Sequence, residues 1–215
     1  MSDIFQEIDE DLRRDKVSAL WNKYQNLVYA AVALVILGTA GVTGWRIYDG
    51  RVKEQAGAAY LSALQVTSQD PKAAIEVFAK LAQEGGPVAD LARFDMARAA
   101  VLAGDKPAAL DILAAMVADT KIDTPMRGAA ALMGAYLALD LGKGDQANAL
   151  VQPLLAEGNA YRLLALEVTG LVALGAGDTA KAREIFTQLE PLAAANDAPG
   201  QMRERVAIML DRLAQ

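Results

Sequence analysis

Apolar residues recur at helical spacing from residue 52 to the end of the chain, in segments separated by Gly, Asp and Pro. Four segments align when each is started at an aspartate: 70–82, 105–117, 145–157 and 178–190. Alanine follows four positions later, and mostly larger residues follow after eight and eleven: Ala74, Ala109, Ala149 and Ala182; Phe78, Leu113, Pro153 and Phe186; Leu81, Met116, Ala156 and Leu189. These positions share one face of a helix, so the pattern predicts four amphipathic helices that bury this face.

Each of these helices is expected to begin at its aspartate, directly after the turn that ends the preceding helix. An aspartate side chain caps a helix by accepting hydrogen bonds from the free N–H groups of the first turn, which predicts N-caps at Asp70, Asp105, Asp145 and Asp178. Gly104, Gly144 and Gly177 precede three of them, and glycine favours the left-handed conformation that ends a helix. The pair Gly-Asp is therefore interpreted as a helix stop joined to a helix start.

Another helix precedes each aspartate, over residues 52–66, 89–104, 125–144 and 161–177, and a last one is expected over 199–214 as a cap on the open end. The aspartates stand 35, 40 and 33 residues apart, a period typical of stacked helical hairpins. The pattern resembles the tetratricopeptide repeat, which has a small residue where the two helices cross. Ala97, Leu137 and Gly170 stand there, and Leu137 departs from the rule. Pro153 is expected to kink its helix or end it early.

The glycines of LGKGDQANA (141–149) and LGAGDTAKA (174–182) also match the G-x-G-x-x-G/A fingerprint of dinucleotide-binding proteins. That fingerprint follows a strand and opens a helix, whereas here helices are expected on both sides. The element also recurs at the repeat period. A turn between helices is therefore the preferred interpretation, and no cofactor is expected.

The segment from Leu27 to Trp45 contains no charged residue, and as a helix it would span ~28 Å, close to the ~30 Å hydrocarbon core of a bilayer. Aromatic residues flank it at both ends, as interfacial anchors do: Trp21, Tyr24, Tyr29, Trp45 and Tyr48. We expect an uncleaved transmembrane helix over residues 27–48, since the long acidic stretch before it is unlike a signal peptide. A cleaved signal that releases a secreted or envelope-assembly repeat protein is the alternative.

One face of this helix carries four small residues, Ala33, Ala40, Gly41 and Gly44. Such residues permit close packing against a second membrane helix, although they are also ordinary in a single-pass helix. Residues 1–26 have apolar positions at helical spacing and are expected to form a cytoplasmic amphipathic tail. The repeat domain, residues 49–215, is then expected on the other side of the membrane. The basic residues flanking the helix favour this orientation only weakly, so a domain that faces the cytoplasm stays open.

Composition limits the chemistry. The chain has no Cys and no His, which excludes thiol and imidazole catalysis and the metal sites that those side chains form. The formal net charge of −6 argues against a nucleic-acid partner. The four serines lie in no nucleophile motif, and carboxylates such as Glu84 and Asp90 stand at ordinary loop and cap positions. We therefore expect no enzyme, no catalytic residue, no metal and no cofactor.

The order of acidic tail, one membrane helix and degenerate repeats, with the start MSDIFQEIDEDLRRDKVSALWNKYQN, resembles the YfgM-type ancillary subunit of the bacterial Sec translocon, in its alphaproteobacterial form. The resemblance implies a single-pass inner-membrane protein with a cytoplasmic N-terminus and a periplasmic repeat domain. It also implies association with the SecYEG channel and with a membrane-anchored periplasmic chaperone. No catalytic residues are implied.

Stacked hairpins offer an extended surface to protein partners. Charged residues on the first helix of each hairpin are the candidate contacts, and we expect them to be exposed: Arg93, Asp95, Arg98, Arg127, Arg162 and Glu167. Each of them also fits an ordinary solvated surface. Tyr136 is on the same helices, but Tyr136 and Met133 are expected to belong to the core.

Overall fold

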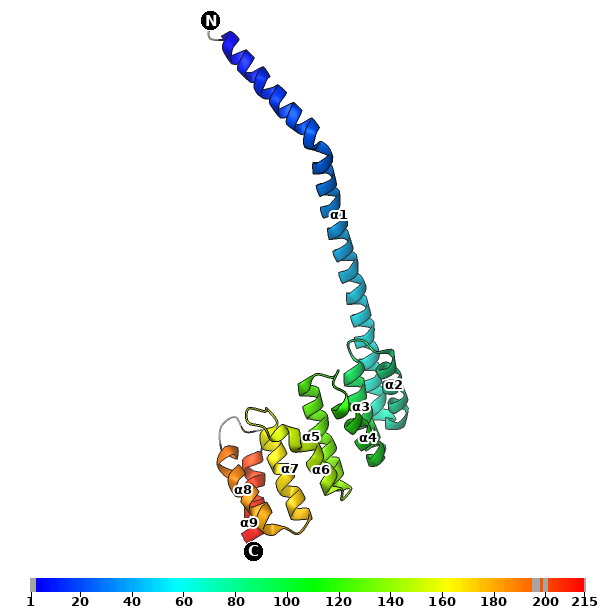
Figure 1. Cartoon of the computed structure of the whole chain (residues 1–215). Helices are drawn as coiled ribbons and strands as arrows, with labels where there is room; N and C mark the ends of the chain where they lie inside the picture. Colours follow the sequence, from blue (N-terminus) through cyan, green and yellow to red (C-terminus); the bar gives the residue numbers. More distant parts are fainter. Residues whose placement is uncertain (1–2, 195–197, 199–200, 215) are drawn as a thin grey trace. The chain divides into compact units, whose positions relative to one another are not determined.

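The computed structural model of the chain describes residues 3–194, 198 and 201–214, and these form helices and turns with no strand. Residues 1–54 and 55–215 are two compact units. The elements, labelled in Figure 1, are α1 (Asp3–Gln69), α2 (Pro71–Glu84), α3 (Ala89–Leu102), α4 (Lys106–Ala118), α5 (Thr124–Asp140), α6 (Gly144–Val151), the 3-10 turn η1 (Gln152–Leu155), α7 (Arg162–Gly175), α8 (Thr179–Ala193) and α9 (Met202–Ala214).

The first unit consists of the greater part of α1. Its described apolar side chains between Leu27 and Ile47 are exposed, and Leu34 and Leu37 each keep 71% of their surface accessible. By length and composition, α1 is one helix among the described residues that could cross a membrane. The helix runs without a break into residues 52–66, as the absence of proline predicts. Most side chains of the expected apolar face of the tail, residues 1–26, lie outside the described side chains.

The second unit is a stack of helical hairpins. The last residues of α1 pack with α2 and α3 around Phe78, and the hairpins α3–α4, α5–α6 and α7–α8 follow. Each helix from α2 onward contacts the next one in the chain (Figure 1). Helix α9 packs on α8 and buries Met202, Val206 and Leu213. The all-α solenoid with an apolar N-terminal helix and a C-terminal capping helix is therefore confirmed.

Three of the four predicted N-caps are confirmed. The carboxylates of Asp70, Asp105 and Asp178 each accept a hydrogen bond from a backbone N–H of the following turn, at 3.0 Å for the closest. The fourth prediction is wrong, because α6 begins at Gly144 with Lys143 at the N-cap position, and Asp145 lies inside the first turn. The left-handed residue of that turn is correspondingly Gly142, with φ of 69°, and not Gly144.

The third repeat is therefore shifted by two residues from the sequence alignment. Its buried positions are Ala147, Val151 and Leu154, in place of Ala149, Pro153 and Ala156. With Lys143 as reference, the four helix starts are 35, 38 and 35 residues apart. The predicted positions of the other three repeats are all buried: Ala74, Ala109, Ala182, Phe78, Leu113, Phe186, Leu81, Met116 and Leu189.

The shift also restores the small residue where two helices cross. Ala135, fully buried, takes the position that the sequence alignment gave to Leu137, so the third hairpin keeps the rule together with Ala97 and Gly170. At Gly170 the space is tightest, since a Cβ atom there would lie 2.9 Å from Cζ of Phe186. As expected, Pro153 ends its helix early: α6 stops at Val151 and the chain continues as a 3-10 turn.

Candidate protein-binding surface

The six charged candidates lie on first helices of the hairpins, as predicted. Arg93, Asp95 and Arg98 are on α3, Arg127 is on α5, and Arg162 and Glu167 are on α7. In a hairpin stack these helices line one side of the array, which is the side that repeat proteins offer to partners. Among the described residues the structure pairs Asp95 with Arg98, and the other four candidates contact residues outside the set of six.

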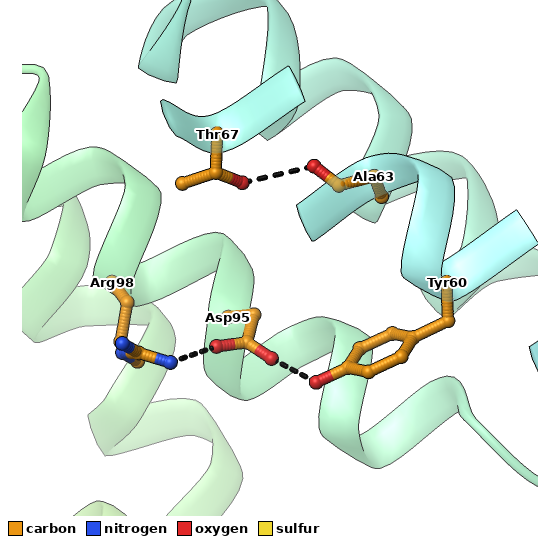
Figure 2. A network of polar contacts seen from close by, with 5 residues as sticks. All are labelled: Tyr60, Ala63, Thr67, Asp95 and Arg98. Atoms are coloured by element: carbon orange, nitrogen blue, oxygen red, sulfur yellow. Dashed lines mark hydrogen bonds and ion pairs between the residues drawn. The ribbon is translucent and has the colours of Figure 1, made fainter. Parts of the chain in front are cut away.

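Asp95 joins α1 to α3 (Figure 2). Its side chain is 7% exposed, and its Oδ2 accepts a hydrogen bond from the hydroxyl of Tyr60. Its Oδ1 accepts one from Nη1 of Arg98 at 2.7 Å. Burying a carboxylate costs free energy unless it is paired and hydrogen-bonded. The Tyr60 hydroxyl and the Arg98 guanidinium meet that requirement for Asp95.

Glu167 joins α5, α7 and α9 in the same manner. Arg205 of α9 donates from Nε to Oε1 at 2.7 Å and from Nη2 to Oε2 at 2.8 Å, the two-pronged geometry in which arginine binds carboxylates best. The hydroxyl of Tyr136 donates to Oε2 at 3.4 Å. Burial, followed by the charge of Glu167, raises the pKa of Tyr136 to about 12, and the hydrogen bond to Glu167 raises the pKa of Arg205.

Three expectations about exposure are therefore wrong. Asp95 and Glu167 are buried, not exposed, because each accepts hydrogen bonds from neighbouring helices of the stack. Tyr136 is not a core residue: 36% of it is exposed, although its hydroxyl donates to the buried carboxylate of Glu167. Met133 is half-buried against the cluster around Leu113, as expected.

The other three candidates are also held by the chain. Arg93 pairs with Asp119, which follows α4, at 2.9 Å, and this hydrogen bond holds the pKa of Asp119 below its usual value. Arg162 donates from Nε to the carbonyl oxygen of Leu155 at 3.2 Å. Arg127 has only a 3.5 Å contact with Thr124, and its buried Nε has no partner among the described residues.

The six candidates are thus mainly links between helices, and the accessible groups beside them form the available surface. The guanidinium of Arg98 belongs to a side chain that is 57% exposed, and Leu91, Leu102 and Tyr136 are exposed apolar or aromatic side chains on the same set of helices. Arginine and tyrosine are enriched in protein interfaces. Sequence reasoning missed Tyr60 and Arg205, although Tyr60 precedes Asp95 by 35 residues, one full repeat.

The described residues contain no group of three or more acidic, His or Cys side chains that could hold a metal ion. Both glycine fingerprints span a turn between helices and the start of the second helix, LGKGDQANA from α5 to α6 and LGAGDTAKA from α7 to α8. The interpretation as a turn between helices is therefore confirmed for both, whereas Gly-Asp as helix stop and helix start holds for Gly177–Asp178 and is wrong for Gly144–Asp145, where Gly142 is the left-handed residue.

A family model described as "Tetratricopeptide repeat-like domain" matches residues 18–215. The chain belongs to this family. The match begins before the apolar segment of α1, so this tetratricopeptide repeat-like family includes the segment together with the repeats. No curated protein matches the chain.

Solved structures show the same fold. The chain is similar to the kinesin light chain nearly identical TPR-like repeats of Podosopora anserina, with a TM-score of 0.56, 18% identity, and coverage of 78% of this chain and 87% of that one. A single-substitution variant of the same repeats gives a TM-score of 0.57 at 18% identity, with 78% and 86% covered. The MamA RS-1 ArsTM double mutant gives a TM-score of 0.52 at 14% identity, with 74% and 94% covered.

Proposed function

We propose that this tetratricopeptide repeat-like protein is a non-catalytic, membrane-anchored scaffold that binds other proteins through its repeats. In this proposal residues 27–48 cross the bilayer, residues 1–26 form a cytoplasmic tail, and residues 49–215 form a periplasmic domain. The fold supports the coarser part, because tetratricopeptide-like stacks typically bind protein partners and provide no catalytic groups.

The exposed apolar helix is the observation on which the anchor rests. Side chains such as Leu34, Ile36 and Leu37 keep 71%, 61% and 71% of their surface accessible. In water they would form a large apolar surface, which soluble monomers rarely expose, whereas a bilayer would solvate them. An anchor also raises the effective concentration of the repeats near membrane partners, because both are confined to one surface.

The partner surface is proposed on the first helices of the hairpins. Arg93, Arg98, Arg127 and Arg162 would contact the partner, while Asp95 and Glu167 hold the helices that present them. The proposed face for a neighbouring membrane helix consists of the small residues Ala33, Ala40, Gly41 and Gly44. Gly41 and Gly44 are open within the described chain, since nothing lies within 4 Å of a Cβ atom built at either one. From the YfgM-type resemblance, the proposed partners are SecYEG and a membrane-anchored periplasmic chaperone.

Photo-crosslinking of the full chain in its own membrane tests the binding surface. A crosslinking amino acid replaces Leu91 on α3 or Tyr136 on α5, both exposed. Matched controls replace Val77 on α2 and Glu184 on α8, which are exposed on second helices. We expect defined protein adducts from the first-helix positions and few from the controls. Equal adducts from all four positions, or none from any, would contradict the proposed surface.

Membrane attachment is tested separately. The full chain should stay in the pellet after alkaline carbonate washing, and protease added to intact spheroplasts should digest the repeats while the first 26 residues stay protected. Release by carbonate would refute the anchor. Digestion of the tail with protection of the repeats would reverse the proposed orientation and leave the scaffold intact.

A further inference from the structure

Three hairpin turns of the second unit have the same backbone geometry, which allows their side chains to be compared position by position. In each, a left-handed glycine is followed by the residue that precedes the next helix: Gly104–Asp105, Gly142–Lys143 and Gly177–Asp178. The N–H of that second residue donates to a carbonyl five residues back, at 2.9, 2.7 and 2.9 Å. Lys106 is thus equivalent to Gly144, and Asp140 is equivalent to Gly175.

Between the hairpins α3–α4 and α5–α6 these two positions form an ion pair. Lys106, the first residue of α4, contacts Oδ2 of Asp140, the last residue of α5, at 2.9 Å. One repeat later, the first residue of α6 and the last of α7 are both glycine, so neither partner of the ion pair is present. A hollow of about 260 Å³ lies there, and Gly144 and Gly175 are among the residues that line it.

We call this hollow the glycine junction. The residues that line it suit a long cationic side chain. Leu139 and Val172 provide apolar walls for an aliphatic stem. Its one charged side chain is the carboxylate of Asp145, and α7 ends at the hollow with Gly175 and Ala176, while α6 begins there with Gly144. A helix C-terminus carries partial negative charge, and no backbone N–H of the described residues donates to the carbonyls of Gly175 or Ala176.

Asp145 is free for this role because of the register found in the third repeat. Its equivalents by sequence alignment, such as Asp105 and Asp178, direct their carboxylates to the first turn of their own helix. Asp145 lies two residues beyond the N-cap position, is exposed, and has no ion-pair partner among the described residues. An anion would be repelled by the carboxylate of Asp145, and a purely apolar group would leave that carboxylate and the carbonyls at the end of α7 unpaired.

We propose that the glycine junction binds the side chain of a lysine from a partner polypeptide, in place of the ion pair that fills the equivalent position one repeat earlier. The stem lies between Leu139 and Val172, and the ammonium group meets the carboxylate of Asp145 and the carbonyls at the end of α7. This site is at the turns of the hairpins and is additional to the first-helix surface. It can be tested with a peptide alone, so its failure would leave the proposed function standing.

The test uses the full chain in zwitterionic micelles, labelled with ¹⁵N at glycine only. The probe is the peptide acetyl-Gly-Lys-Gly-amide, and its control is the same peptide with norleucine in place of lysine. We expect saturable shifts at Gly142, Gly144 and Gly175 with the lysine peptide, none with norleucine, and none at Gly85 or Gly104. Equal shifts with both peptides, shifts spread over all glycines, or no shifts at millimolar peptide would each overturn the proposal.

Two variants sharpen the result. Asp145→Asn should weaken the lysine peptide about threefold, the range of a partly exposed ion pair, while Asp111→Asn, the same charge change on exposed α4 surface, should not. The double change Gly144→Lys and Gly175→Asp should rebuild the ion pair inside the hollow and weaken binding about tenfold or more. A Cβ at Gly175 meets open space, and one at Gly144 lies 3.3 Å from Cγ1 of Val172, so the fold should tolerate both. Undiminished binding by the double variant would refute the site.

Discussion

Removing Arg205 should loosen the C-terminal helix much more than removing its partner Glu167. The carboxylate of Glu167 belongs to a side chain that is 7% exposed, whereas the side chain of Arg205 is 43% exposed. Arg205→Met leaves the buried charge with a single 3.4 Å bond from Tyr136. Breaking a fully buried pair in this way costs about 3–5 kcal/mol, and the partial exposure of Arg205 lowers our expectation to about 2 kcal/mol.

The reverse change, Glu167→Met, leaves a guanidinium that water can reach, so its cost should stay below about 1 kcal/mol. The double variant should resemble Glu167→Met, because apolar replacement of both partners leaves no buried charge. Hydrogen–deuterium exchange at the amides of α9 measures this: Arg205→Met should raise the opening constant about 30-fold over the parent chain. Arg212→Met, an exposed change on the same helix, is the control and should have little effect.

The reasoning fails if the two single variants cost the same, or if Arg205→Met costs less than about 0.5 kcal/mol. Either result would mean that water already solvates the carboxylate in the native state. A double variant as destabilised as Arg205→Met would instead indicate lost packing and not an unpaired charge.

Three further changes are predicted from the second unit. Gly170→Ala should destabilise the domain by about 1 kcal/mol in urea unfolding, since the added methyl would overlap the fully buried ring of Phe186 by more than the helix preference for alanine offsets; an unchanged or higher midpoint would show that the ring moves aside. Asp178→Ala should cost about 1 kcal/mol through its lost N-cap, whereas Asp145→Ala should cost almost nothing, and equal losses would contradict the register described above. The raised pKa of Tyr136, about 12 against 10 when unfolded, means that its contribution to stability is intact below pH 10 and is lost between pH 10 and pH 12. Burial and the hydrogen bond to Asp95 raise the pKa of Tyr60 to about 12 as well, so ultraviolet titration of tyrosinate should show two groups near pH 12 in the parent chain and one in Tyr136→Phe; an unchanged high-pH step in that variant would refute the burial of the Tyr136 hydroxyl.

For the candidate site, residue type and position predict which residues lie on the first helices but not what their side chains do. The charged residues on α3, α5 and α7 are found from the sequence, because helical periodicity and the repeat period place them on first helices. Their roles are not found, since a carboxylate such as Glu167 could equally face water. It is buried because Arg205 and Tyr136 reach it from other helices, 38 and 31 residues away in the chain. Such partners depend on how whole helices pack, and no local sequence pattern predicts them.

The chain by itself determined the helical hairpins, the apolar segment of α1 and three of the four N-caps, because each depends on residues within a few positions of one another. The register of the third repeat was decided only by the tertiary structure. Locally, Gly144–Asp145 is the better helix start, and an aspartate cap is worth about 1 kcal/mol. Starting at Lys143 instead buries Ala147, Val151 and Leu154 in the core, and a buried valine or leucine contributes about 1.5–3 kcal/mol. Burial exceeds capping, so the stack sets the position of this helix against its own local preference.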